Sequence, residues 1–208
     1  LDVPSASRLL TNLHLQGTAD NLLTNINNVH LLDQQPDGTY VLELNEANFP
    51  AIFPSMRLLY KNAMMIVKLQ IKVVDVNWWL EGSHAADMGW MHPKDFPIDT
   101  TTQVDIQQWV AIQQFFEWIK GLPKSNLTAF EFATNVLDNS KASSTNITDL
   151  AQLTAWDEIE INALAVAFHW VAAAPPFDAI KEKFKLSENL VRLADCRQAL
   201  RRMGVNAA

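Results

Sequence analysis

The chain has 208 residues, a formal net charge of −7 and a hydrophobic content of 49%, with six glycines and one cysteine. This length allows one large domain or two small ones, and the apolar content excludes a disordered or collagen-like chain. The acidic balance counts against nucleic acid as a partner, since nucleic-acid binders normally carry a basic surface. Because Cys196 is alone, no internal disulfide can form.

The apolar runs are too short for a membrane span. The two longest, residues 63–67 and 161–176, fall short of about 20 clean apolar residues, so we expect no direct membrane contact by this segment. No basic-then-apolar leader opens the sequence. Residues 204–208 are typical of a helix end followed by another turn, and we expect a piece of a longer protein.

The first 52 residues are polar and are predicted to form an N-terminal segment of their own. Within them, Pro36-Asp37-Gly38 lies between two apolar stretches. This tripeptide favours a tight turn, because proline presets φ and glycine accepts a positive φ. The residues after it alternate between apolar and polar, as in a strand. We therefore predict a β-hairpin over residues 29–44, while the pattern before it suits short helices and extended chain equally.

From residue 53 to residue 208 the pattern predicts an α-helical domain. Its first helix shows the i, i+3, i+4, i+7 spacing of a single apolar stripe. The expected buried face comprises Met56, Leu59, Tyr60, Ala63, Met64 and Val67.

A short helix and a long loop are expected next. Asp75 is placed to cap a helix over residues 76–81. Residues 82–102 are expected to form a loop, which Trp78 and Trp90 hold against the core because aromatic rings bury a large area.

The clearest helix runs from Gln103 to Lys120, where Gly121 and Pro123 provide a conventional stop. Its expected buried face comprises Ile106, Trp109, Ile112, Gln113, Phe116 and Ile119. If the Trp109 ring is part of the core, its truncation to alanine costs about 3–5 kcal/mol.

The remaining pattern is also helical. In order, it predicts a helix over 127–137, a polar loop over 138–146, one turn over 149–153, a helix after 157 that ends before 172, and a last helix from 187 to 204. Thr154 and Asp157 resemble a capping box with aspartate in place of glutamate. The predicted fold class is therefore mainly α: an irregular multi-helix domain with a small β-hairpin element near the N-terminus.

Four polar residues of the predicted loop are candidates for metal binding. His84, Asp87, His92 and Asp95 combine imidazole and carboxylate groups, which bind zinc and other divalent ions. Their spacing matches no metal motif such as His-Glu-x-x-His. We interpret them as a solvated polar loop, and a metal-dependent enzyme is the third of three hypotheses.

Other residues that could act in catalysis have structural explanations. Glu158 and Glu160 are two apart on a helix, so they point in different directions, and acidic residues suit a first helical turn. His169 is interpreted as a partly buried helix-end residue, and Cys196 as a small core residue. No nucleophile elbow or phosphate-binding glycine loop is present. We expect no enzyme activity, catalytic residue, metal or cofactor.

Charge is distributed unevenly along the chain. Residues 176–208 carry a net charge of +3 and the rest −10. We interpret the basic end as a solvated helix face, with an interface between oppositely charged surfaces as the alternative. Asn126 and Asn146 fit the N-glycosylation pattern, which arises easily by chance in an asparagine-rich chain.

Four stretches of the helical region carry patterns that occur in the same order and at similar spacing in one family. They are Leu58–Val67 followed by Asp75–Leu80, Phe96-Pro97 followed by Trp109, Phe115 and Leu122-Pro123, Leu150–Asp157, and Leu193–Ala208. Over residues 56–208 the chain thus resembles the helical shell region of the A component of Tc-type insecticidal toxin complexes (ABC toxin, virulence plasmid A-like). It departs from that family at Trp78-Trp79, where the family has an acidic residue, and in the loop 83–95.

The resemblance implies a structural role. Such A components are very large bacterial chains that assemble into homopentameric, pore-forming translocation devices, and the toxic enzyme resides on another component. This segment would then be a non-enzymatic part of the shell, secreted or attached to the cell surface. Its partners would be other domains of the same chain and neighbouring protomers.

A second hypothesis is a stand-alone helical module that binds a protein or a glycan. It is motivated by the seven tryptophans of the chain, because tryptophan is enriched at the centres of binding surfaces.

Overall fold

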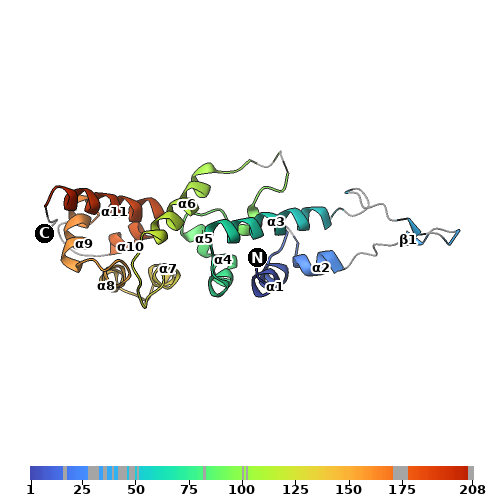
Figure 1. Cartoon of the computed structure of the whole chain (residues 1–208), viewed down its shortest axis with the longest axis horizontal. Coiled ribbons are helices and arrows are strands. Elements are labelled where there is room, and N and C mark those ends of the chain that lie inside the picture. Colours follow the sequence, from blue (N-terminus) through green and yellow to red (C-terminus); the bar gives the residue numbers. More distant parts are fainter. Residues whose placement is uncertain are drawn as a thin grey trace. The chain divides into compact units, whose positions relative to one another are not determined.

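The protein is mainly α-helical, as its periodicity predicts (Figure 1). The computed structural model describes residues 1–15, 18–27, 33–34, 37–38, 40–41, 46, 50, 52–81, 83–99, 101, 103–170 and 178–205. They form two compact units, one of residues 1–82 and 92–104 and the other of residues 83–91 and 105–208. The boundary between these units differs from the predicted domain boundary, which follows residue 52.

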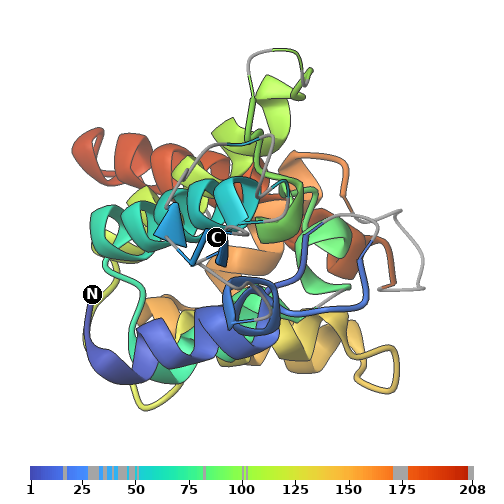
Figure 2. The ribbon, with the colours of Figure 1, turned by 90° about the vertical axis from the view of Figure 1, so that its right-hand side faces the viewer.

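The first unit is built around one long helix. Its helices are α1 (Val3–Asn12), α2 (Leu22–Asn27), α3 (Ile52–Leu69) and α4 (Val76–Leu80), with 3₁₀ turns at Val73–Asp75 and Pro93–Asp95. Both α1 and α2 pack against α3, and α1 also contacts α4. Figure 2 shows α1 and α3 one above the other. The residues before 52 and those after it therefore share one core, which is why the units do not divide at residue 52.

A short antiparallel pair lies in the range predicted as a β-hairpin. Strand β1 (Asp33–Gln34) pairs with β2 (Tyr40–Val41), with Asp33 opposite Val41. Between them, Gly38 has a φ of +84°, the conformation that glycine accepts at no steric cost. Most other residues of the predicted hairpin, 29–44, lie outside the described residues.

The predicted buried face of α3 is wrong. Three of its members, Met56, Tyr60 and Val67, are 54%, 65% and 52% exposed. The buried residues are instead Ile52, Ser55, Leu58, Asn62, Met65 and Ile66. Apolar residues occur around most of this helix, so the spacing alone allows more than one stripe, and packing on α1 and α2 selects among them.

The tryptophans that hold the predicted loop are Trp79 and Trp90, whereas the expected pair is Trp78 and Trp90. Trp90 is buried as predicted, and its indole N–H donates to Ser187 Oγ at 3.0 Å. Trp78 is only partly buried, whereas Trp79 is buried and packs edge-on against Phe96. The predicted loop also contains a short helix, α5 (His84–Asp87).

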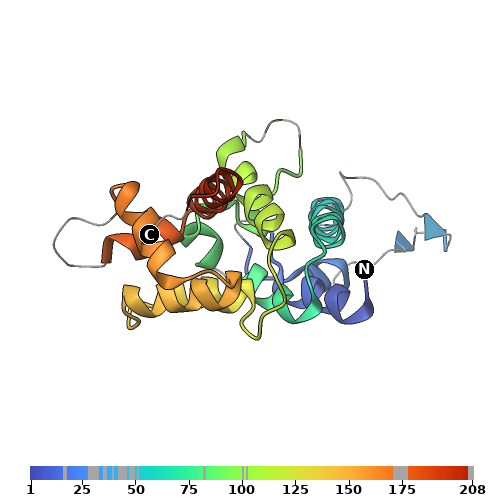
Figure 3. The ribbon, with the colours of Figure 1, turned by 60° about the vertical axis from the view of Figure 1, so that its left-hand side comes forward.

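The second unit contains the remaining helices. They are α5, α6 (Ile106–Lys120), α7 (Ala129–Leu137), α8 (Ser143–Thr154), α9 (Glu158–Ala167), α10 (Asp178–Phe184) and α11 (Ser187–Arg202). Helix α11 packs against α6 (Figure 3), and α8 contacts α7, α9 and α10. The predicted helices over 127–137 and from 187 are confirmed, with Thr128 and Glu131 forming a capping box at the start of α7.

Helix α8 corrects two predictions. It begins at Ser143, where the sequence predicts a polar loop followed by a single turn. Ser143 and Asn146 are both buried in this helix, which excludes glycosylation of Asn146 in the folded unit. Thr154 does not cap the next helix, because it ends α8 and its hydroxyl donates to the Leu150 carbonyl. Asp157 alone caps α9, accepting from the Ile159 N–H at 2.7 Å.

The buried face of α6 is centred on Phe115, which the predicted stripe omits. Phe115 is fully buried, whereas Ile106 is exposed and Trp109 is only partly buried. The ring of Phe115 lies 4.8 Å from that of Trp90 and 5.9 Å from that of Phe130. The aromatic rings and α11 both pack on α6, so the buried region of α6 is wider than a single stripe. A pattern that assumes one stripe therefore misplaces the centre of that region.

Phe115, and not Trp109, is therefore the residue of α6 whose truncation should destabilise the second unit most. We expect Phe115→Ala to lower the free energy of unfolding by about 3–5 kcal/mol, since it removes a fully buried ring. Trp109→Ala should cost less, because part of the Trp109 side chain remains in water. Urea unfolding followed by circular dichroism measures both, and an equal or larger loss for Trp109→Ala would contradict the assignment of this face.

Candidate functional site

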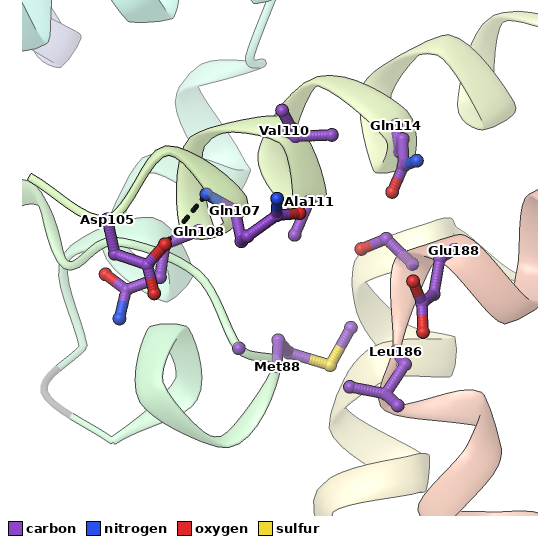
Figure 4. Close-up of a pocket in the computed structure, with 11 residues that line it drawn as sticks. Met88, Asp105, Gln107, Gln108, Val110, Ala111, Gln114, Leu186 and Glu188 are labelled. Carbon is purple, nitrogen blue, oxygen red and sulfur yellow. Dashed lines mark hydrogen bonds between the residues drawn. The ribbon is translucent and has the colours of Figure 1, made fainter.

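Two cavities in the second unit are the candidate sites for ligands. The first, which we call the α6 N-terminal cavity, has a volume of about 340 Å³ and lies where α6 and α11 begin (Figure 4). Met88 and Leu186 provide apolar surface, and three glutamines, Gln107, Gln108 and Gln114, provide amide groups. Amides both donate and accept hydrogen bonds, so this cavity suits an uncharged polar group.

The two carboxylates of the α6 N-terminal cavity lie at helix N-termini, which balance part of their negative charge. Asp105 caps α6 by accepting from the Gln107 N–H at 2.9 Å, the bond drawn in Figure 4. Glu188 lies in the first turn of α11. Carboxylates at helix N-termini are stabilised by the positive end of the helix dipole. Their negative charge is therefore partly balanced, and this cavity attracts a cation only weakly.

The second cavity, which we call the Trp156 cavity, has a volume of about 300 Å³. It lies at the end of α6, between the connection from α8 to α9 and one face of α11. Its lining includes Trp156, Leu122, Pro123, Val191, Glu117 and Asp195. No sequence pattern marks this site, because Glu117 and Asp195 are ordinary exposed helix residues that are brought together only by the packing of α11 on α6.

A partly buried ion pair holds the wall of the Trp156 cavity. Arg197 Nε donates to Glu160 Oε2 at 2.7 Å, with the two side chains 9% and 14% exposed. The guanidinium carbon of Arg197 also lies 4.7 Å from the centre of the Trp156 ring. One arginine of α11 thus fixes both the start of α9 and the tryptophan before it.

The four metal candidates are not assembled into a site. His84 and Asp87 belong to the second unit, whereas His92 and Asp95 belong to the first. Within the described residues, no three His, Cys, Asp or Glu side chains are grouped so as to hold a metal ion. His92 instead caps the 3₁₀ turn after it, where its Nδ1 accepts from the Lys94 N–H at 3.1 Å.

The other candidate residues lie apart from one another. Glu158 is exposed at the start of α9, and Glu160 is held by Arg197. His169 is exposed with a φ of +56°, not partly buried as expected, because it forms the left-handed turn after α9. Cys196 is partly exposed on α11 rather than in the core.

The basic end of the chain is not only a solvated face. Arg197 and Lys181 are buried, and the Lys181 ammonium donates to the Asp138 carbonyl. The guanidinium of Arg192 lies over the Phe168 ring at 4.4 Å. These three cations therefore hold the second unit together, whereas Arg201 and Arg202 are exposed as expected.

Comparison of the chain with protein-family models, curated proteins and solved structures gives no match. Within the part of the chain that the structure describes, no helix combines the length and the apolar character needed to cross a membrane.

Breaking the ion pair of Arg197 tests its role. Because removal of one partner leaves a desolvated charge, Glu160→Gln should lower the free energy of unfolding by about 3 kcal/mol. The double variant Glu160→Leu with Arg197→Met should recover part of that loss. Glu182→Gln, which breaks the more exposed pair with Lys185, is the control and should cost under about 1 kcal/mol. Equal losses for Glu160→Gln and the control would contradict a structural role for the buried pair.

His92 should make stability depend on pH. Burial lowers its pKa below the ordinary value of 6.5, and the charge of Lys94 lowers it further, while Asp95 opposes both effects. The unfolded chain therefore binds the proton more readily, so the contribution of His92 is present above pH 6.5 and is lost as the pH falls through the lowered pKa. His92→Gln should reduce the loss of stability on acidification. An unchanged pH dependence, measured by urea unfolding between pH 7.5 and 5, would contradict this account.

Proposed function

We propose that this chain is a non-enzymatic helical scaffold segment of a large pore-forming toxin component, of the kind that Tc-type A components represent. The observation that carries the proposal is that residues from the resembling stretches contact one another within each unit. Residues that a family shares for packing are expected to contact one another in this way.

In the first unit, two of the four resembling stretches meet. The Lys61 ammonium of α3 donates to the Pro97 carbonyl, and the Trp79 ring of α4 lies 6.4 Å from that of Phe96. Lys61 belongs to the first stretch, and Phe96 and Pro97 belong to the second, whereas Trp79 lies where the chain departs from the family. A neighbouring residue, Asn62, is fully buried and donates to the Leu58 and Pro93 carbonyls, which fixes the same segments.

In the second unit, the other two stretches meet in the same way. Trp156 belongs to the third stretch and Arg197 to the fourth, and the guanidinium carbon of Arg197 lies 4.7 Å from the centre of the Trp156 ring. Leu150 and Leu193, one from each stretch, are both buried. Side chains from both stretches are thus engaged in packing, which supports a scaffold role.

The proposal extends to assembly and location. The partners would be other domains of the same large chain and neighbouring protomers in a homo-oligomer, and the parent protein would be secreted or attached to the bacterial surface. The pair of short strands at 33–41 would belong to a small β-hairpin over residues 29–44 that precedes the helical region.

A stand-alone helical binding module is the second candidate. It is favoured by one observation, the partly exposed ring of Trp156 at the wall of a cavity of about 300 Å³. Such a volume lies at the small end of the range for ligand pockets, roughly 300–1,000 Å³.

The size of the native polypeptide distinguishes the two candidates. An antibody raised against this chain should detect a band many times heavier than 23.4 kDa in the cells that produce the protein, and also in their medium or surface fraction. Preincubation of the antibody with the purified chain should abolish the band, as the control. A specific band near 23.4 kDa would contradict the scaffold proposal and favour the stand-alone module.

A further inference from the structure

We propose that the Trp156 cavity binds the cationic side chain of a lysine or arginine presented by a partner polypeptide. The cavity combines an aromatic ring, two carboxylates and the carboxyl end of a helix, and each of these favours a positive charge. Apolar residues between them would accommodate the methylene stem of the same side chain. The proposal concerns a ligand site on the second unit and does not depend on the scaffold role.

The carboxylates provide the charge of the site. Asp195 and Glu117 both line the cavity, from α11 and α6 respectively. Among the described residues, Asp195 has neither a hydrogen bond nor an ion pair. Glu117 pairs with Lys120 at 2.7 Å, but both side chains are more than half exposed, so solvent screens that pair strongly.

The end of α6 adds to the negative potential. Gly121 closes this helix, and its N–H donates to the Trp118 carbonyl at 3.0 Å. Gly121 and Trp118 both line the cavity. The last carbonyl groups of a helix carry the negative end of its dipole and attract cations. In the α6 N-terminal cavity the corresponding helix ends are positive and already meet Asp105 and Glu188, so the two cavities differ in the charge they favour.

The Trp156 ring attracts cations, as its contact with Arg197 within the second unit illustrates. The guanidinium of Arg197 lies 4.7 Å from the centre of the Trp156 ring, while the ring also lines the cavity. Electron density on the face of an indole attracts guanidinium and ammonium groups. None of the described lining residues is basic, and the bound side chain would meet the part of the ring that Arg197 leaves open to the cavity.

The stem of the bound side chain would lie on apolar surface. Leu122 and Pro123 form one wall, and Val191 and Ala194 of α11 form another. Val191, Ala194 and Asp195 are spaced i, i+3 and i+4, so they share one helix face. Long basic side chains characteristically pack their methylene groups on apolar surface while the charged end reaches polar groups, and this wall ends at the Asp195 carboxylate.

Nuclear magnetic resonance of the full 208-residue chain tests the proposal. We expect N-acetyl-arginine amide to shift the Trp156 indole and Gly121 amide resonances saturably. N-acetyl-citrulline amide, which has a similar shape but no charge, should produce much smaller shifts. A peptide with leucine on each side of the arginine should bind more tightly than the isolated amino-acid amide, because it also covers the apolar walls. Equal binding of the peptide and the amino-acid amide would overturn the assignment to a polypeptide partner.

Variants identify the site. Asp195→Asn should weaken arginine binding about three- to five-fold, as expected for the loss of one partly exposed charge pair. Glu188→Gln, which neutralises a carboxylate of the other cavity, is the matched control and should leave the affinity unchanged. The proposal is overturned if the citrulline compound binds equally well, if Asp195→Asn has no effect, or if the shifts occur around Met88 and Gln108 instead. A heavy native polypeptide without arginine binding would support the scaffold role and reject this site.

Discussion

The packing of Phe115 is the constraint on which the second unit depends. Its ring is fully buried, and the rings of Trp90, Phe116, Trp118 and Phe130 lie around it with centres 4.8–5.9 Å away. These residues come from α6, α7 and the segment after α5, so one contact group fixes the rotation of α6 and the position of its neighbours. With Phe115 inside, Glu117 must face outward, and the carboxylate becomes part of the wall of the Trp156 cavity.

Polar contacts then determine how the connections between helices are held. Arg197 joins the start of α9 to the tryptophan before it, and Lys181 reaches the carbonyl at the end of α7. In the first unit, Lys61 and Asn62 of α3 play the same part for the segment around Pro93 and Pro97. Buried cations and amides that bond to backbone carbonyls and carboxylates avoid the cost of desolvation, and they order segments that have little apolar surface of their own.

The scaffold proposal and the proposed cation site are compatible but independent. A shell segment must present surfaces to other domains or protomers, and a cavity that accepts a lysine or arginine side chain would provide a specific contact of this kind. Electrostatic complementarity at such a contact contributes to specificity and orientation more than to affinity. The exposed apolar residues of α3, among them Met56 and Tyr60, are a further surface, but nothing in the described residues indicates what covers them.

The sequence by itself determined the mainly α fold class, the order of most helices and the end of α6 at Gly121, because spacing and stops are local properties. It placed the cap of α9 at Thr154 instead of Asp157. It did not determine which face of α3 or α6 is buried, because both helices carry apolar residues on more than one side. It also predicted a loop where α8 begins, since the burial of Ser143 and Asn146 depends on contacts with the rest of the second unit. The Trp156 cavity was decided only by tertiary structure, because its carboxylates lie 78 positions apart and meet only where α11 packs on α6.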